Sequence, residues 1–183
     1  MNVEVTRTYL HLAHPEDLNP ARVDDSRVRV ECVAECPASF YRYLYSEVGR
    51  LYHWTDRLSW TDDEIRSHLA RSEITLWVMT IEGAPAGYFE LERHPDGSIE
   101  IAYFGLIQEF LGRGLGKHLL TVAAEQAWAD GANRVWLHTC TLDDKAAMPN
   151  YRRRGFTPFK QETYVTAISP EELREGRWRE LVG

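Results

Sequence analysis

The stretch LGRGLGKH at residues 111–118 places Gly112, Gly114 and Gly116 directly before an apolar, alanine-rich run. Gly is less favourable than Ala inside a helix by about 1 kcal/mol, so this spacing at a predicted helix start indicates that bare backbone has a use there. One such use is to hold a phosphate against the unpaired N–H groups of a helix N-terminus, where the helix dipole favours negative charge. The fold must then leave this loop open to a ligand.

Two common phosphate-binding loops do not fit this stretch. A Walker-type loop needs Gly and Ser or Thr at the positions that Leu111 and His118 occupy. A dinucleotide-binding GxGxxG fingerprint needs its last glycine at position 117, which is Lys117. The loop therefore has to be interpreted from the elements around it.

The elements around the loop predict an α+β fold. Three β-rich runs over 75–83, 84–94 and 98–107, separated by short turns, indicate an antiparallel meander before the loop. A helix over 117–130 follows the loop and ends at Gly131. The other expected elements are strands over 28–35 and 134–140, helices over 37–49, 61–70 and 146–155, and one or two strands over 156–168. This order predicts a mixed, mostly antiparallel central sheet flanked by helices.

Composition narrows the classes of function. A length of 183 residues predicts a single domain over 1–183, and a formal net charge of −7 argues against a nucleic-acid partner. We find neither a signal peptide nor a run of about 18 apolar residues, so we expect a cytoplasmic protein with no membrane partner. The cysteines Cys32, Cys36 and Cys140 give no disulfide framework and no complete zinc site, so no metal is expected. A homodimer is left open.

Two motifs resemble the GCN5-related N-acetyltransferase (GNAT) superfamily. The family's (Gln/Arg)-x-x-Gly-x-(Gly/Ala) motif falls on Leu111, Gly114 and Gly116, with Leu in place of the first polar residue. The family's later segment, Asn-x-x-Ala-x-x-x-Tyr-x-x-x-Gly-Phe, is similar to the residues Asp144, Ala147, Tyr151, Gly155 and Phe156, with Asp in place of Asn. The resemblance implies the acyl-CoA N-acyltransferase fold, with an acetyl-CoA-binding core over 75–165 and a variable, substrate-side part over 1–74.

The resemblance also implies that acetyl-CoA is a co-substrate. The backbone amides of 112–117 would wrap its pyrophosphate, and Arg113 and Lys117 would add positive charge. The strand before the loop would splay from its neighbour so that pantetheine pairs with the backbone, with Gly105 at a local bulge. The implied cofactor-binding residues are Phe104, Gly105, Leu106, Gly112, Arg113, Gly114, Leu115, Gly116, Lys117 and Asp144.

Acetyl transfer to an amine needs a base for the amine and a proton for the leaving thiolate. By similarity Tyr151 is the general acid, with a core tyrosine as the plainer interpretation. Glu100 lies at the offset of the family's catalytic glutamate, and burial on a strand would raise its pKa; an exposed salt-bridged carboxylate is the alternative. Glu90, His138 or a water chain are the other candidate bases.

The segment YHWTDRLSW at 52–60 lies where the family forms its acceptor pocket. We assign the acceptor side to His53, Trp54, Glu90 and His138, although packing aromatics would give the same pattern. The predicted function is acetyl transfer from acetyl-CoA to a primary amine by direct attack in a ternary complex. The acceptor stays open among small amines, amino acids, antibiotics and protein N-termini or lysines. A non-catalytic acyl-CoA sensor and a structural module are the alternatives from other classes.

Overall fold

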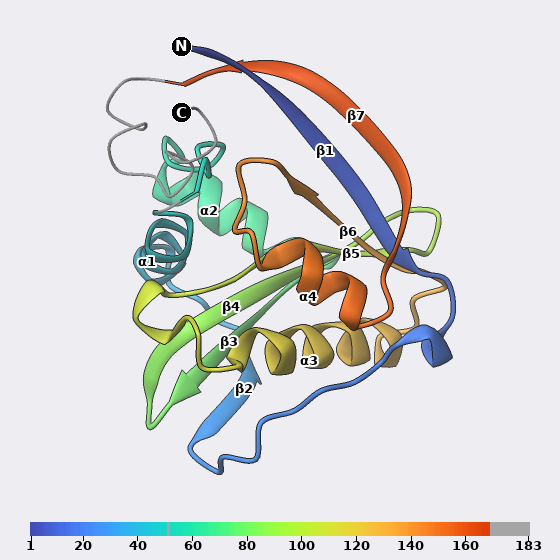
Figure 1. The fold of residues 1–183 in the computed structure, drawn as a ribbon. Coiled ribbons are helices and arrows are strands. Elements are labelled where there is room, and N and C mark those ends of the chain that lie inside the picture. Colours follow the sequence, from blue (N-terminus) through green and yellow to red (C-terminus); the bar gives the residue numbers. More distant parts are fainter. Residues whose placement is uncertain (51, 169–183) are drawn as a thin grey trace.

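A computed structural model describes residues 1–50 and 52–168. Its centre is a seven-stranded sheet with the order β2-β3-β4-β5-β6-β1-β7 (Figure 1). The strands are β1 Asn2–Leu12, β2 Val28–Cys32, β3 Ile74–Ile81, β4 Ala84–Arg93, β5 Ile99–Leu106, β6 Val135–Cys140 and β7 Thr157–Ala167. The α-helices are α1 Ala38–Gly49, α2 Asp62–Leu69, α3 Leu115–Ala129 and α4 Ala147–Arg153, and short 3-10 turns span Pro15–Asp17 and Gln108–Phe110.

The predicted mixed, mostly antiparallel sheet is confirmed. β3, β4 and β5 form the expected meander, and β5 with β6 is the parallel pair. The turn between β3 and β4 has two residues, Glu82 and Gly83, with φ of 50° and 86°. Positive φ at both positions matches the twist of the flanking strands, which is why this short connection closes a hairpin.

The start of α2 agrees with its sequence signal, whereas α3 starts earlier than predicted. Thr61 caps α2 in a capping box with Glu64, as its spacing predicts. By contrast, α3 begins at Leu115, two residues before the predicted start, and Gly114 is its N-cap with a φ of 73°. The first turn of α3 thus contains Gly116, and the glycine loop leads directly into the helix.

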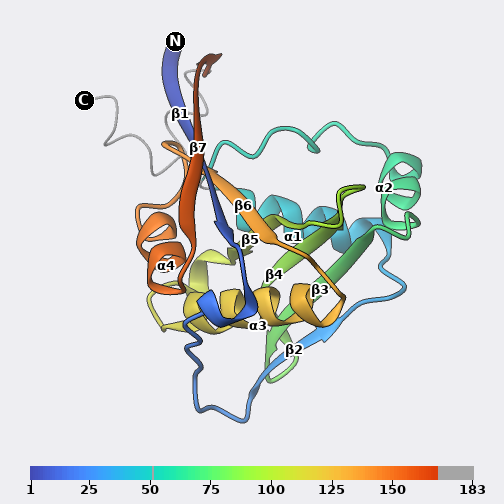
Figure 2. The same ribbon diagram turned by 90° about the vertical axis from the view of Figure 1, so that its right-hand side faces the viewer.

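The first strand, β1, was absent from the predicted elements. The segment NVEVTRTYLHL forms an 11-residue strand that lies between β6 and β7 and is antiparallel to both. β1 and β7 make a long ribbon that extends past the rest of the sheet (Figure 2). The predicted final strand or strands are one strand, β7, whose partner comes from the other end of the chain.

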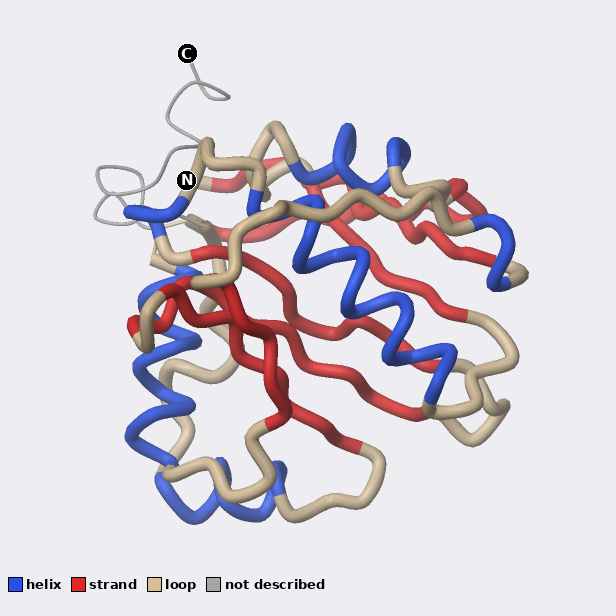
Figure 3. Tube along the Cα trace, turned by 90° about the horizontal axis from the view of Figure 1, so that it is seen from below, coloured by secondary structure: helices blue, strands red, loops and turns tan. Residues whose placement is uncertain are grey.

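Helices cover both faces of the sheet. α3 crosses one face, where its apolar side joins a core with Leu10, Phe89 and Ile101 (Figure 3). α1 and α2 cover the other face over a second core that includes Leu76, Val78 and Tyr88. Within 1–50 and 52–168, no helix has the length and apolar character needed to cross a bilayer.

Candidate active site

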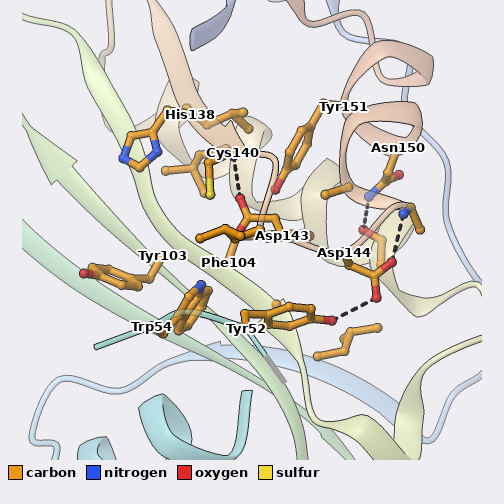
Figure 4. Close-up of a pocket in the computed structure, with 18 of the residues that line it drawn as sticks. Tyr52, Trp54, Tyr103, Phe104, His138, Cys140, Asp143, Asp144, Asn150 and Tyr151 are labelled. Carbon is orange, nitrogen blue, oxygen red and sulfur yellow. Dashed lines mark hydrogen bonds between the residues drawn. The ribbon is translucent and has the colours of Figure 1, made fainter. Parts of the chain in front are cut away.

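β5 and β6 separate soon after they meet. They pair only at Ile99–Val135 and Glu100–Trp136, and beyond these residues the two strands diverge. A pocket of about 870 Å³ opens at this split (Figure 4). Its walls come from β5, β6, the glycine loop, α4 and the segment after α1. One cavity therefore extends from the glycine loop to the segment after α1.

The glycine loop forms one end of the pocket. Gly112 and Gly114 have φ of 76° and 73°, a backbone conformation that L side chains rarely adopt, which explains glycine at both positions. No side chain caps α3, and its first turn holds no acidic residue. The first N–H groups of a helix have no partner within the helix, so this end of the pocket offers donors to an anion.

The implied cofactor residues divide into two groups. Phe104, Gly105, Leu106, Gly112, Gly114, Leu115, Gly116, Lys117 and Asp144 all line the pocket. Arg113 does not line it, because its guanidinium donates to the Glu109 carbonyl at 2.9 Å and lies over the Phe110 ring. Asp144 accepts hydrogen bonds from the Ala146 amide at 2.8 Å and the Tyr52 hydroxyl at 2.9 Å, which ties two walls of the pocket together.

Asn150 is a pocket residue that the sequence analysis missed. Its side-chain amide donates to the Gly116 carbonyl at 3.1 Å and so links α4 to the start of α3. It lies between Ala147 and Tyr151 of the second motif, at a variable position of that motif, so only the fold reveals its contact.

The expected bulge at Gly105 is wrong. The register between β4 and β5 shifts between Glu90 and Leu91, which leaves Ala102 as the extra residue. Glycine is required at position 105 for a different reason, because a Cβ there would come within 2.5 Å of the Val48 Cγ1 on α1. Glycine at this position allows α1 to pack directly on the strand beside the split.

Tyr151 projects from α4 into the pocket with its hydroxyl directed inward (Figure 4). Its ring packs edge-on against Phe104 and Phe156, and the residue is only 6% exposed. Burial, followed by the nearby Asp143 carboxylate, raises the pKa of this phenol far above its ordinary value. The hydroxyl therefore keeps its proton at neutral pH and can donate a hydrogen bond into the pocket.

Glu100 lies on β5 at the other side of the split. One carboxylate oxygen is 2.9 Å from the His94 Nε2, and the other is 3.7 Å from the His138 Nε2. Burial raises the pKa of Glu100 above its usual range, while burial and then the positive charge of Arg7 lower the pKa of His138. Both groups line the pocket and are suited to proton transfer.

Glu90 requires a correction, because it is not at the pocket. It is fully buried beneath α1 and α2, where Arg57 holds its two oxygens at 2.8 and 3.1 Å. Tyr41 donates to it at 3.0 Å, and His68 lies at 3.0 Å. Although burial raises its pKa, the hydrogen bonds from His68 and Arg57 outweigh burial and lower it overall. Glu90 is thus an ion-paired carboxylate of the core and does not line the pocket.

The segment after α1 forms the opposite wall. Tyr52, His53 and Trp54 line the pocket, and Trp54 also packs against Tyr45 and Tyr103 with ring centroids 5.6 and 5.1 Å away. Trp54 is therefore both a packing residue and a wall residue.

Glu100 also belongs to a group of three side chains on β4, β5 and the turn between them that could hold a metal ion. Glu92, His94 and Glu100 place one ligand atom each within 4.8 Å of one another. Carboxylate and imidazole ligands of this kind suit a first-row divalent ion such as zinc or manganese. The sequence analysis, which considered only the cysteines, did not identify this group.

Residues 38–156 match the model of the acetyltransferase (GNAT) family. The chain therefore belongs to the GNAT family. Among curated proteins, none matches the sequence.

Solved structures share the fold at low identity. A GCN5-related N-acetyltransferase from Kribbella flavida is 23% identical, with a TM-score of 0.63, over 90% of this chain and 58% of that one. A functionally unknown protein from Staphylococcus epidermidis is 19% identical, with a TM-score of 0.61, over 90% and 62%. An aminoglycoside acetyltransferase from an uncultured soil sample is 16% identical, with a TM-score of 0.60, over 79% and 98%. The chain thus spans less than two thirds of the first two proteins.

Proposed function

We propose that the protein is an acetyl-CoA-dependent N-acetyltransferase that acts on a primary amine in a ternary complex. The observation that carries the proposal is one pocket joining three features: the N–H-rich start of α3, the split between β5 and β6, and the protonated hydroxyl of Tyr151. A thioester bound along the split would have a proton donor at one side and the Glu100 carboxylate at the other.

Each residue has a proposed role in the transfer. The amides of 112–117 and the Lys117 ammonium bind the pyrophosphate, and the backbone of Phe104, Gly105 and Leu106 pairs with pantetheine. Glu100 takes a proton from the acceptor amine as the N–C bond forms. Tyr151 gives its proton to the thiolate sulfur as the C–S bond breaks. His138 is close enough to Glu100 to pass the collected proton toward solvent.

Binding of CoA is the first test. Ligand at about 100 times its dissociation constant should stabilise the folded protein by about 2.7 kcal/mol, measurable as a thermal shift. Gly114→Val should abolish that shift while the protein stays folded, since Val disfavours the positive φ that the loop needs. Gly131→Val, just after α3 and also at a positive φ of 84°, is the matched control: it imposes the same kind of backbone strain away from the pocket and should keep the shift. Unchanged affinity in folded Gly114→Val would remove the loop from the cofactor site.

Turnover separates an enzyme from an acyl-CoA sensor. Mass spectrometry with acetyl-CoA and a library of amines and lysine peptides should detect an acetylated product. Tyr151→Phe should lower kcat by about 10²–10⁴-fold without weakening CoA binding, because it removes only the proton donor. Binding of CoA with no product from any amine would support the sensor.

A further inference from the structure

Arg7, on the strand β1 that was not among the predicted elements, places a positive charge at the pocket. It projects from β1, where it lies opposite Cys140 of β6 and Glu162 of β7, and it lines the pocket together with Cys140. Its terminal nitrogen donates to the Tyr164 hydroxyl at 3.4 Å, and its guanidinium lies over the Tyr164 ring. Its Nε is buried and has no hydrogen-bond partner.

The Arg7 guanidinium has no carboxylate as an ion-pair partner among the described residues. Within 1–50 and 52–168, no Asp or Glu forms an ion pair with Arg7. Glu162, its cross-strand neighbour, is held by Lys160 at 2.5 Å and by the Tyr9 hydroxyl at 2.8 Å. The other arginine on this side of the pocket, Arg57, is neutralised by Glu90. Arg7 is thus a pocket cation on β1 whose Nε lacks a hydrogen-bond partner; Arg154, whose Nε also lacks one, reaches the pocket from the end of α4.

The position of Arg7 relates it to the proposed base. Arg7 lies opposite Cys140 and Tyr9 lies opposite His138, so Arg7 and His138 are diagonal neighbours on β1 and β6, and His138 Nε2 is 3.7 Å from Glu100. The acceptor end therefore holds an anion-binding group and an amine-accepting pair next to one another. A molecule that carries a carboxylate close to a primary amine would meet both.

We propose that Arg7 binds the carboxylate of an amino-acid acceptor, while Glu100 and His138 face its amine. The proposal rests on the proposed transferase function and names its substrate class. A planar guanidinium matches a carboxylate with two parallel hydrogen bonds, and Nε is one of the two donors on one such edge. An acceptor carboxylate would satisfy the buried Nε that the folded chain leaves unpaired. The Tyr164 hydroxyl accepts from a terminal nitrogen and the Tyr164 ring stacks on the guanidinium, but neither contact gives Nε the hydrogen bond that burial takes from it.

The test uses matched acceptor pairs with the full chain. The twenty amino acids and their decarboxylated amines are compared as acceptors by mass spectrometry, followed by steady-state kinetics. We expect at least one amino acid to have a KM about 10–100-fold lower than its matched amine, the range for a charge-assisted hydrogen-bond pair. Arg7→Gln should remove that difference by raising only the KM of the amino acid. Arg7→Lys should keep part of it.

Arg29→Gln is the control, because it makes the same change on exposed β2, at the opposite edge of the sheet. It should leave both KM values unchanged. Equal KM values within every pair, or an Arg7→Gln variant that changes both members equally, would overturn the proposal. A preference for phosphoethanolamine over every amino acid would assign Arg7 to a phosphate and overturn it as well.

Calorimetry of the CoA-bound protein with the same amino acids keeps the two proposals separate. Amino-acid binding that Arg7→Gln abolishes, without any turnover, would support the Arg7 subsite and contradict the transferase. Turnover of amines with no binding of any amino acid would support the transferase and contradict the Arg7 subsite.

Discussion

Glu90 and Glu100 are buried glutamates on neighbouring strands and on the same face of the sheet, yet their surroundings are opposite. Glu90 has a guanidinium, an imidazole and a phenol around it, and its pKa is lowered. Glu100 has two imidazoles near it, no Arg or Lys pairs with it among the described residues, and its pKa is raised. Burial alone therefore does not make a base. A fixed cation makes a buried carboxylate structural, and the lack of one leaves it free to titrate.

The largest expected effect separates the two glutamates by activity. Glu100→Gln keeps size and hydrogen bonding but cannot accept a proton, so kcat at neutral pH should fall by about 10²–10⁴-fold. Raising the pH should recover part of the rate by deprotonating the amine in solution. Steady-state kinetics from pH 6 to 10 measure both (about the range in which amines titrate). A variant with wild-type rates throughout would assign the base to His138 or to water.

The next effect concerns stability. Arg57→Met leaves Glu90 as a buried charge without its main partner, which typically costs about 3–5 kcal/mol. Urea unfolding should show this loss. The double variant Arg57→Met with Glu90→Met should regain much of it, since apolar replacement of a buried ion pair is often close to neutral. If the double variant is no more stable than Arg57→Met, the loss comes from packing and not from the uncompensated charge.

Stability against pH should change in opposite directions for the two sites. The folded-state pKa of Glu100 is raised, so wild-type protein loses stability as pH rises from the unfolded pKa through the folded one. Glu100→Gln should therefore gain in Tm relative to wild type as pH rises from about 4 to 7. The folded-state pKa of Glu90 is lowered, so wild-type protein loses stability as pH falls from the unfolded pKa of about 4 through the folded one, and Glu90→Gln should gain in Tm relative to wild type over that fall. Slopes of equal sign would contradict the comparison.

The smallest expected effect sharpens the origin of the raised pKa. Glu92 lies directly opposite Glu100 on β4, and its negative charge contributes to the raised pKa after burial and the opposing contribution of His94. Glu92→Gln should move the acid limb of the kcat/KM profile to lower pH by less than about one unit. The profile of Glu125→Gln, an exposed change on α3, should not move. A limb that moves to higher pH in Glu92→Gln would mean that Glu92 does not act through its charge.

The sequence predicted the loop end of the pocket better than the acceptor end. Gly112 and Gly114 have positive φ, which a tight loop before a helix requires, and glycine spacing in the sequence indicates such a loop. Tyr151 followed from a motif within one short helix. These features depend on residues close together in the chain, so their placement along the pocket could be expected before the fold was known.

The acceptor end depends on contacts between distant segments. The sequence offered Glu90 and Glu100 as alternative bases on neighbouring strands, but only the fold shows that they share a face and that Arg57 pairs with Glu90. Arg7 reaches the pocket because β1 pairs with strands more than 120 residues away. Local pattern predicts a strand at most, and it does not say which neighbours that strand will have.

The place of β1 between β6 and β7 also sets an order of assembly during synthesis. Its first partner strand begins at Val135, so at about 5–20 residues per second β1 leaves the ribosome roughly 6–25 s before that partner exists. The meander and α3 can form in that interval, because their contacts are local. The strand that carries Arg7 must wait, with its backbone donors and acceptors unpaired in the sheet. The acceptor end of the pocket, which needs β1 and β6 together, therefore cannot form before residue 140 has been made.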